Sequence, residues 1–234
     1  LELVRLCRQE GLKSIVYTNG LLLDSVYSRD IIKAGMEEIR FSVDGITQSV
    51  YEKNRVGGEF EKVWKNMKVM TKIAKEEKSH VKLIWQFIAL RNNEHQIEKA
   101  RSMAKEIGII FEVKTFAESV PELAPKNSYF QRKLKRLPCI DIYNQTMVYW
   151  NGDVVPCCYD LEGNEIMGNL KKNTMEEIWN GDKYKNFRNR LKKSVFKPEL
   201  QPEFCKGCLK YSPPKLQGNF ASKFRTLLMY RYLK

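Results

Sequence analysis

The chain has 234 residues, and its 41 Lys and Arg against 28 Asp and Glu give a formal net charge of +13. Its hydrophobic content of 43% is enough for a folded core, which excludes a wholly disordered chain. No apolar run approaches the about 20 residues that a membrane-spanning helix needs. The first residues show no signal-peptide pattern and look like the end of an amphipathic helix. These features predict a cytoplasmic protein that does not associate with a membrane.

Basic residues concentrate in two segments, 183–193 and 223–234, which also carry apolar residues at helical spacing. We interpret both as helices with solvated basic faces, as in a basic cytoplasmic enzyme. The excess charge favours anionic partners, including phosphorylated small molecules and acidic peptides. Neither an RNP-like aromatic motif nor a zinc-finger spacing with histidines accompanies these segments, so nucleic acid is not an expected partner.

Residues 1–115 alternate short β-rich runs with longer helical periods. The expected strands cover 14–17, 39–43, 81–90 and 109–114, and the expected helices cover 23–34, 60–78 and 93–107. Gly35 and Gly108 closely follow two of these helices, where glycine commonly ends a helix. Strand–helix–strand alternation predicts parallel strands with right-handed crossovers. Four such strands are too few to close an eight-stranded barrel, but they suffice for an open sheet or for part of a barrel.

The pattern changes after residue 115, where three prolines within about twenty residues indicate a linker with a short basic helix at 130–136. Beyond the linker, Asn151-Gly152-Asp153 is typical of a hairpin turn. Thr174 followed by Glu177 is typical of a capping box at the start of a helix. The expected organisation is an α/β domain, a linker and a small α+β domain, at 1–115, 116–138 and 139–234.

Five of the six cysteines lie in the expected second domain, in a chain that shows no sign of secretion, so metal ligation is favoured over disulfides. A Cys-x-x-Cys turn and two cysteines on either side of a hairpin can converge on one tetrahedral or cubane site. These candidate ligands are Cys139, Cys157, Cys205 and Cys208. Thiolates select zinc or iron–sulfur clusters, so spacing alone leaves a cluster, a structural zinc ion and buried free thiols open. We expect Cys158 to be a spare thiol and Cys7 to be a core residue.

Several short motifs follow one another in a recognisable order. They are Tyr17-Thr18-Asn19-Gly20, Phe41-Ser42-Val43-Asp44-Gly45, Tyr51 to Gly58 with Phe60, and Arg91-Asn92-Asn93-Glu94, followed by Cys139, Gly152 and Cys157, Val155 to Asp160, Gly168-Asn169-Leu170 and Glu177-Ile178-Trp179. In this order the chain resembles a radical S-adenosylmethionine enzyme with a C-terminal SPASM or twitch auxiliary-cluster domain. The resemblance covers nearly the whole chain, and it depends on the order and the cysteine spacing more than on any one motif.

The resemblance implies a partial radical S-adenosylmethionine barrel, made of its last four strand–helix units and followed by the small α+β SPASM or twitch domain. The family's C-x-x-x-C-x-x-C and G-G-E-P motifs do not occur in the sequence. We therefore expect the chain to be the C-terminal two-thirds of an N-terminally truncated enzyme. By itself it would be inactive, because a second four-iron cluster would exist only in the intact protein.

The resemblance also implies the cofactors and the residues that bind them. It favours an auxiliary [4Fe–4S] cluster over zinc, with Cys139, Cys157, Cys205 and Cys208 as its ligands. It implies contacts with S-adenosylmethionine from residues at the strand ends: Thr18, Asn19, Ser42, Asp44, Arg55 and Gln86. Arg55 is a candidate for the methionine carboxylate, which a guanidinium can bind with two parallel hydrogen bonds, the alternative being a surface arginine. Asp160, close behind Cys157, is a candidate base, and Asn93 is expected to be only a helix N-cap.

The implied activity is that of an oxidoreductase or maturase. It would use a 5′-deoxyadenosyl radical and the auxiliary cluster to oxidise or modify a peptide or a small sugar-like molecule. An electron donor such as a flavodoxin or ferredoxin is an implied partner. The alternative is a non-catalytic iron–sulfur or zinc module that binds an anionic partner through its basic helices. The sequence identifies no catalytic residue and does not choose among substrates.

Overall fold

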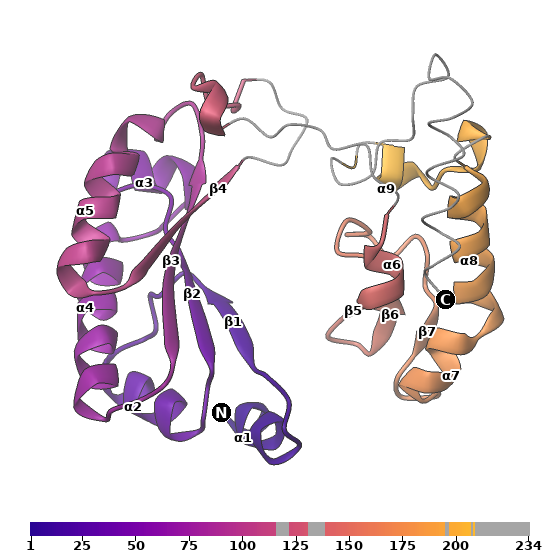
Figure 1. The fold of residues 1–234 in the computed structure, drawn as a ribbon, viewed down its shortest axis with the longest axis horizontal. Helices are drawn as coiled ribbons and strands as arrows, with labels where there is room; N and C mark the ends of the chain where they lie inside the picture. The colour runs from indigo at the N-terminus through magenta and orange to yellow at the C-terminus, as the bar shows by residue number, and fades with distance from the viewer. Residues whose placement is uncertain (116–121, 131–138, 195–196, 207, 209–234) are drawn as a thin grey trace. The chain divides into compact units, whose positions relative to one another are not determined.

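A computed structural model describes residues 1–115, 122–130, 139–194, 197–206 and 208 of the chain. The chain divides into two compact units, residues 1–132 and 133–234 (Figure 1). The basic helix expected at 130–136 lies outside the described residues except for Phe130, and the basic segment at 223–234 lies outside them entirely. Within the described ranges, no helix is both long enough and apolar enough to cross a membrane.

The first unit contains a four-stranded parallel sheet with the strand order β1-β2-β3-β4. Its strands are β1 (Ile15–Thr18), β2 (Glu38–Ser42), β3 (Lys82–Ala89) and β4 (Ile110–Thr115). Its helices are α1 (Glu2–Gln9), α2 (Ser25–Lys33), α3 (Gln48–Asn54), α4 (Phe60–Glu76) and α5 (Ile97–Ile107), with the 3₁₀ helices η1 (Glu94–Gln96) and η2 (Ser128–Phe130). The predicted parallel α/β arrangement is confirmed. Helix α3 is an addition to the expected elements, and the helix expected over 93–107 is divided into η1 and α5.

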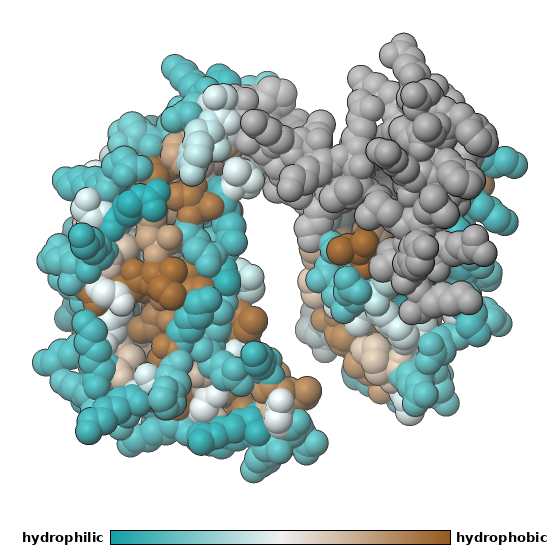
Figure 2. Space-filling model, viewed as in Figure 1, coloured by the Kyte–Doolittle hydropathy of each residue, from teal (hydrophilic) through white to brown (hydrophobic). Residues whose placement is uncertain are grey.

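The core of the first unit lies between the sheet and its helices. Figure 1 shows α3, α4 and α5 along one side of the sheet. Alternate strand residues point toward these helices and are fully buried, among them Phe41 in β2 and Trp85 in β3, while α4 contributes Met67 and Met70. In the same orientation, Figure 2 shows hydrophobic side chains between the strands and the helices, and hydrophilic ones on the outer side of the helices.

The opposite face of the sheet carries charged side chains from neighbouring strands. Arg40 in β2 forms ion pairs with Glu38 and with Glu112 in β4, and its guanidinium lies over the Tyr17 ring, 5.7 Å from the centroid. The ammonium of Lys114, 2.9 Å from the Glu112 carboxylate, holds the pKa of Glu112 below its ordinary value, and Arg40 adds to this effect. The sheet therefore has one apolar face covered by helices and one charged face.

The helix ends follow the local signals in the sequence. Asp24 caps α2 by accepting a hydrogen bond from the backbone N–H of Tyr27 at 2.8 Å. Gly35 and Gly108, which follow α2 and α5, have φ angles of 93° and 78°, in the left-handed region that glycine adopts easily. Each of these two helices therefore ends where the sequence predicts.

The second unit contains a three-stranded antiparallel sheet with the order β5-β6-β7. Its elements are α6 (Asp141–Asn144), β5 (Met147–Val148), β6 (Asp153–Val155), β7 (Gly168–Asn169), α7 (Met175–Asn180), α8 (Asp182–Lys193), η3 (Pro198–Leu200) and α9 (Glu203–Lys206). The predicted hairpin turn lies between β5 and β6, with Gly152 at a φ of 91°. A small core contains Ile142, Val154, Tyr184 and Leu191. The predicted small α+β unit is confirmed.

Helix α7 begins with the predicted capping box. The backbone N–H of Glu177 donates to Thr174 Oγ1 at 3.2 Å, and the backbone N–H of Thr174 donates to Glu177 Oε2 at 2.9 Å. We expect Thr174→Ala to lower the free energy of unfolding by about 1 kcal/mol, while Thr174→Ser keeps the hydroxyl and most of the stability. Equilibrium unfolding in urea measures both changes, and equal losses in the two variants would contradict a capping role for the hydroxyl.

Candidate metal centre and strand-end site

Four cysteines from separate elements of the second unit line one largely enclosed cavity. Cys139 precedes α6, Cys157 follows β6, Cys205 lies in α9 and Cys208 lies just beyond it. Cys157 and Cys208 are buried, and Cys139 and Cys205 are half-buried. The other lining residues are mainly apolar or aromatic: Asp141, Ile142, Tyr159, Phe187 and Phe204. The structure thus brings together all four of the cysteines that the sequence singles out.

Burial controls the ionisation of these thiols. It raises the pKa of Cys157 to about 12, and it also raises the pKa of Cys139 and of Cys205. Each thiolate would also disfavour the next, since Cys139 and Cys208 further raise the pKa of Cys205. Without a bound cation, burial therefore favours the neutral form of these three thiols, and the binding of a metal or cluster must release protons.

Backbone N–H groups point at two of the sulfur atoms. The N–H of Tyr159 donates to Cys157 Sγ at 3.5 Å, and the N–H groups of Asp141 and Ile142 donate to the sulfur of Cys139. Such donors stabilise negative charge on a ligating sulfur and are common around protein-bound clusters. They lower the pKa of these two thiols, in opposition to the effect of burial.

The donor set fits an iron–sulfur cluster better than a single ion. In the described part of the chain, no group of three or more His, Cys, Asp or Glu side chains is arranged to hold a metal ion. All four cysteines line this cavity, and a zinc ion would need each of their sulfur atoms at about 2.3 Å. A four-iron cluster instead binds each sulfur at a different iron, which suits four thiols spread around a cavity.

The other candidate residues from the sequence, Cys7, Cys158 and Asp160, do not line the cysteine cavity. Cys158 is exposed, Cys7 lies half-buried on α1 of the first unit, and neither lines the cavity. Asp160, considered as a base, is buried, and its carboxylate accepts hydrogen bonds from the backbone N–H groups of Asn164 at 2.8 Å and Glu165 at 2.9 Å. The assignment of Asp160 as a base is corrected, because both carboxylate oxygens hold the loop that follows.

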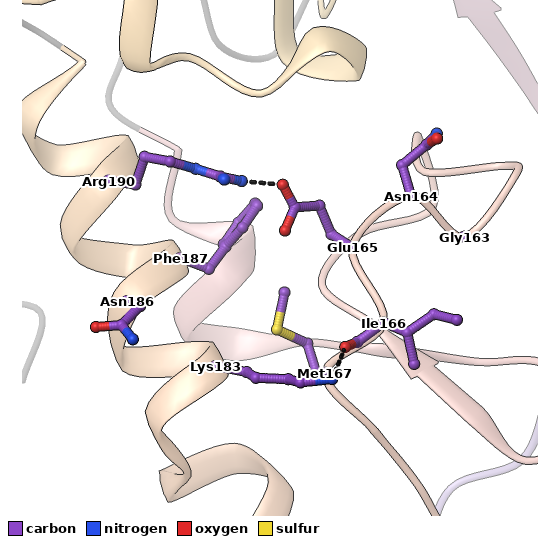
Figure 3. A pocket seen from close by; sticks show the side chains of 9 residues that line it. All are labelled: Gly163, Asn164, Glu165, Ile166, Met167, Lys183, Asn186, Phe187 and Arg190. Carbon is purple, nitrogen blue, oxygen red and sulfur yellow. Dashed lines mark hydrogen bonds and ion pairs between the residues drawn. The ribbon is translucent and has the colours of Figure 1, made fainter.

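That loop forms one side of a second cavity, of about 500 Å³, against helix α8 (Figure 3). Arg190 in α8 forms an ion pair with Glu165, and Lys183 Nζ donates to the carbonyl of Ile166 at 2.9 Å. Phe187 points into the space between these residues in Figure 3, and it also lines the cysteine cavity. The two cavities therefore share the side chain of Phe187.

In the first unit, the strand register decides which predicted residues come together. Ser42 in β2 lies directly beside Gln86 in β3, at the carboxyl end of the sheet. Thr18 in β1 instead aligns with the buried Phe41, so its side chain lies on the helix-covered face. The Thr18 hydroxyl accepts a hydrogen bond from the N–H of Gly20 at 3.0 Å. Ser42 and Gln86 thus share one face, and Thr18 shapes the turn after β1.

Two more predicted residues form an ion pair at the strand ends. The carboxylate of Asp44 is buried, and its Oδ2 accepts from Arg55 Nε at 2.9 Å and Nη2 at 2.6 Å. Its Oδ1 accepts from the backbone N–H of Ile88 at 2.7 Å. Arg55 keeps 32% of its side chain exposed. The expectation that Arg55 is either a ligand or a free surface residue is therefore refined, because Asp44 holds the guanidinium at the strand ends. Asn19, in turn, uses its side-chain oxygen to accept from the N–H of Leu21 at 3.1 Å.

Buried amide side chains that the sequence reasoning missed support these loops. Asn93 is fully buried, its Nδ2 donates to the carbonyls of Asp44 at 3.1 Å and Ile88 at 3.0 Å, and its Oδ1 accepts from the N–H of Leu90 at 2.7 Å. Asn93 is the N-cap residue of η1, as predicted, but its side chain makes no capping hydrogen bond and instead joins two strand ends. Asn66 of α4 donates to the carbonyl of Gly20 at 2.8 Å. Its position on the apolar face of α4 was the signal that could have identified it.

Comparison with known proteins identifies the domain that contains the four cysteines. Residues 139–209 match the SPASM model, an iron–sulfur cluster-binding domain, and this segment contains all four cysteines of the cavity. The structure of SuiB from Streptococcus suis bound to the precursor peptide SuiA superposes with a TM-score of 0.61 at 13% identity, over 92% of this chain and 61% of that one, which shows a shared fold. Residues 139–209 are therefore a SPASM domain.

Two further proteins are similar to this chain. An S-adenosyl-L-methionine-dependent 2-deoxy-scyllo-inosamine dehydrogenase from Niallia circulans is 30% identical over 78 residues, 33% of this chain and 30% of that protein. The structure of anSMEcpe with bound AdoMet has a TM-score of 0.57 at 13% identity, over 99% of this chain and 74% of that one. The chain thus spans less than a third of the length of the dehydrogenase it matches.

We expect the cysteine cavity to bind an iron–sulfur cluster when the chain is purified without oxygen. The result should be about four iron and four sulfide per chain, and Cys205→Ala should lose most of both. Cys158→Ala is the matched control, because Cys158 is exposed and lies outside the cavity. Metal and sulfide analysis checks the prediction. One bound zinc per chain without sulfide would contradict the cluster and indicate a structural zinc site.

Proposed function

We propose that this chain provides the auxiliary [4Fe–4S] cluster and part of the S-adenosylmethionine site of an oxidoreductase or maturase. The substrate class is a peptide or a small sugar-like molecule. The observation that carries the proposal is the cavity shared by Cys139, Cys157, Cys205 and Cys208 inside the SPASM segment. The names of two similar proteins, an inosamine dehydrogenase and a protein crystallised with a precursor peptide, support the two substrate classes.

The residues of the second unit would serve the cluster in three ways. The four cysteines bind it as thiolates, and the N–H groups of Asp141, Ile142 and Tyr159 stabilise the charge on the sulfur atoms. The aromatic lining excludes water and so lowers the local dielectric. When bound, the cluster supplies one-electron chemistry, and with four cysteine ligands it leaves no iron open for direct substrate binding. Electron acceptance during a net oxidation is therefore the role that this ligand set favours.

The residues of the first unit would bind S-adenosylmethionine at the carboxyl ends of the strands. Ligands of parallel α/β sheets bind at this edge, because neighbouring strands end there together. Ser42 and Gln86 are neighbouring polar side chains on the charged face, suited to hydroxyl and amino groups. Arg55, anchored by Asp44, has donors left for a carboxylate. Thr18 and Asn19 would act by shaping the adjacent turn.

The other cofactor and partner expectations belong to the same proposal. A second [4Fe–4S] cluster that cleaves S-adenosylmethionine would be bound by residues outside these 234. An electron donor of the flavodoxin or ferredoxin type would reduce that cluster. The alternative of a non-catalytic iron–sulfur module is an outcome of the following experiment.

The test uses the intact, anaerobically purified protein and measures S-adenosylmethionine binding and its cleavage to 5′-deoxyadenosine. Gln86→Leu should weaken S-adenosylmethionine binding about tenfold, a loss of about 1.4 kcal/mol, because it removes the polar side chain beside Ser42, where β2 ends. Lys82→Gln, at the opposite end of β3, is the control and should bind normally. Protein that holds iron and sulfide yet binds no S-adenosylmethionine would contradict the enzymatic proposal and support the non-catalytic module.

A further inference from the structure

The guanidinium of Arg188 in α8 is enclosed by aromatic rings in the second unit. Its Cζ lies 4.3 Å from the centroid of the Trp179 ring, 4.6 Å from that of Tyr184 and 5.6 Å from that of Tyr143. Nε donates to the carbonyl of Ile142 at 3.1 Å, and Nη1 donates to the carbonyl of Trp179 at 2.9 Å. Three rings and two carbonyl groups therefore hold the side chain in one position.

The charge of Arg188 is not neutralised by any described residue. No carboxylate in the described ranges forms an ion pair with it, and its Nη2 is buried without a hydrogen-bond partner. Burial lowers the pKa of Arg188, while the rings of Tyr184 and Tyr143 oppose this effect. Arg188 is half-buried, and a partly desolvated cation without an anionic partner is destabilised. The arrangement is therefore explained best by an anion that completes the site nearby.

The cysteine cavity lies next to this enclosure. Ile142, whose carbonyl accepts from Arg188, lines the cavity, and its N–H donates to the sulfur of Cys139. Only one residue of α6 therefore separates the guanidinium from a candidate cluster ligand. On the other side, the Tyr184 ring against Arg188 lies close enough to Cys157 for a thiolate there to raise the pKa of Tyr184.

We propose that Arg188 is the counter-charge of the cluster and makes the cluster easier to reduce. The inference rests on the cluster ligation proposed above for Cys139, Cys157, Cys205 and Cys208. A cluster held by four thiolates is anionic, and its negative charge grows by one on reduction, so a fixed cation in a low-dielectric surrounding favours the reduced state. The step is the addition of one electron, taken from the substrate radical in the proposed reaction or from dithionite in the test. No bond forms or breaks at Arg188, which acts as a positioning charge.

The experiment measures the midpoint potential of the auxiliary cluster in the anaerobically loaded chain, by redox titration followed by electron paramagnetic resonance. Arg188→Met keeps an apolar stem in the aromatic enclosure but removes the charge. At a fixed potential its ratio of reduced to oxidised cluster should fall about tenfold, which is about 59 mV for one electron. Arg188→Lys should restore most of the loss. Lys185→Gln, which removes an exposed charge from the same helix, should change the ratio less than about twofold, because solvent screens that charge.

A second measurement covers the case in which Arg188→Met does not load. The unfolding midpoint in guanidinium chloride is compared for the wild-type protein and the variant, each with and without the cluster. The proposal expects a larger loss in the loaded form than in the cluster-free form. Equal losses, including unfolding of both forms, would overturn it in favour of a purely structural arginine, and so would an unchanged potential in a loaded variant. If the wild-type chain holds no cluster at all, the proposed cluster ligation itself fails.

Discussion

Burial makes it costly to ionise the thiols of Cys139, Cys157 and Cys205, and neighbouring sulfur atoms add to that cost. The second unit has a small core, so these side chains at the meeting point of α6, β6 and α9 occupy a large part of its interior. A bound cluster would offset the negative charge of four thiolates and join three separate segments, which would couple metal binding to folding. The backbone N–H groups of Asp141 and Ile142 would stabilise negative charge on the sulfur of Cys139. The proposed counter-charge, Arg188, donates to the carbonyl of the same Ile142.

The strand ends of the first unit depend on buried polar groups of a different kind. The carboxylate of Asp44 and the amide of Asn93 satisfy backbone groups of loops that follow different strands. Asn66 does the same for the turn at Gly20. An unpaired backbone group in such a place would be costly, so these side chains fix the loops before any ligand arrives. Candidate ligand-binding residues and residues that support the loops therefore lie side by side at the strand ends. Asp44 and Arg55 belong to both groups, because both are candidate ligands and they form an ion pair with each other.

The sequence predicted which residues form the candidate sites better than it predicted how their side chains are arranged. The four cysteines were selected because donor chemistry and spacing limit which residues can bind a soft metal or cluster, and the structure places them around one cavity. The candidate residues at the strand ends were selected by their motifs, but the motifs did not show on which face of the sheet each side chain lies. Thr18 and Ser42 match neighbouring motifs, yet the register of β1 and β2 turns their side chains to opposite sides of the sheet. Asp160 was misassigned, because its loop contacts are visible only once the chain is folded.

The sequence by itself determined the parallel α/β order, the helix ends at Gly35 and Gly108, the capping box at Thr174 and the set of four cysteines. These features depend on periodicity, backbone preference and donor chemistry, which act over a few residues or belong to the residue itself. Only the tertiary structure decided the contacts of Asn93 and Arg188. Their partners lie on elements distant in the chain, and whether a polar group is buried depends on packing that no local pattern encodes.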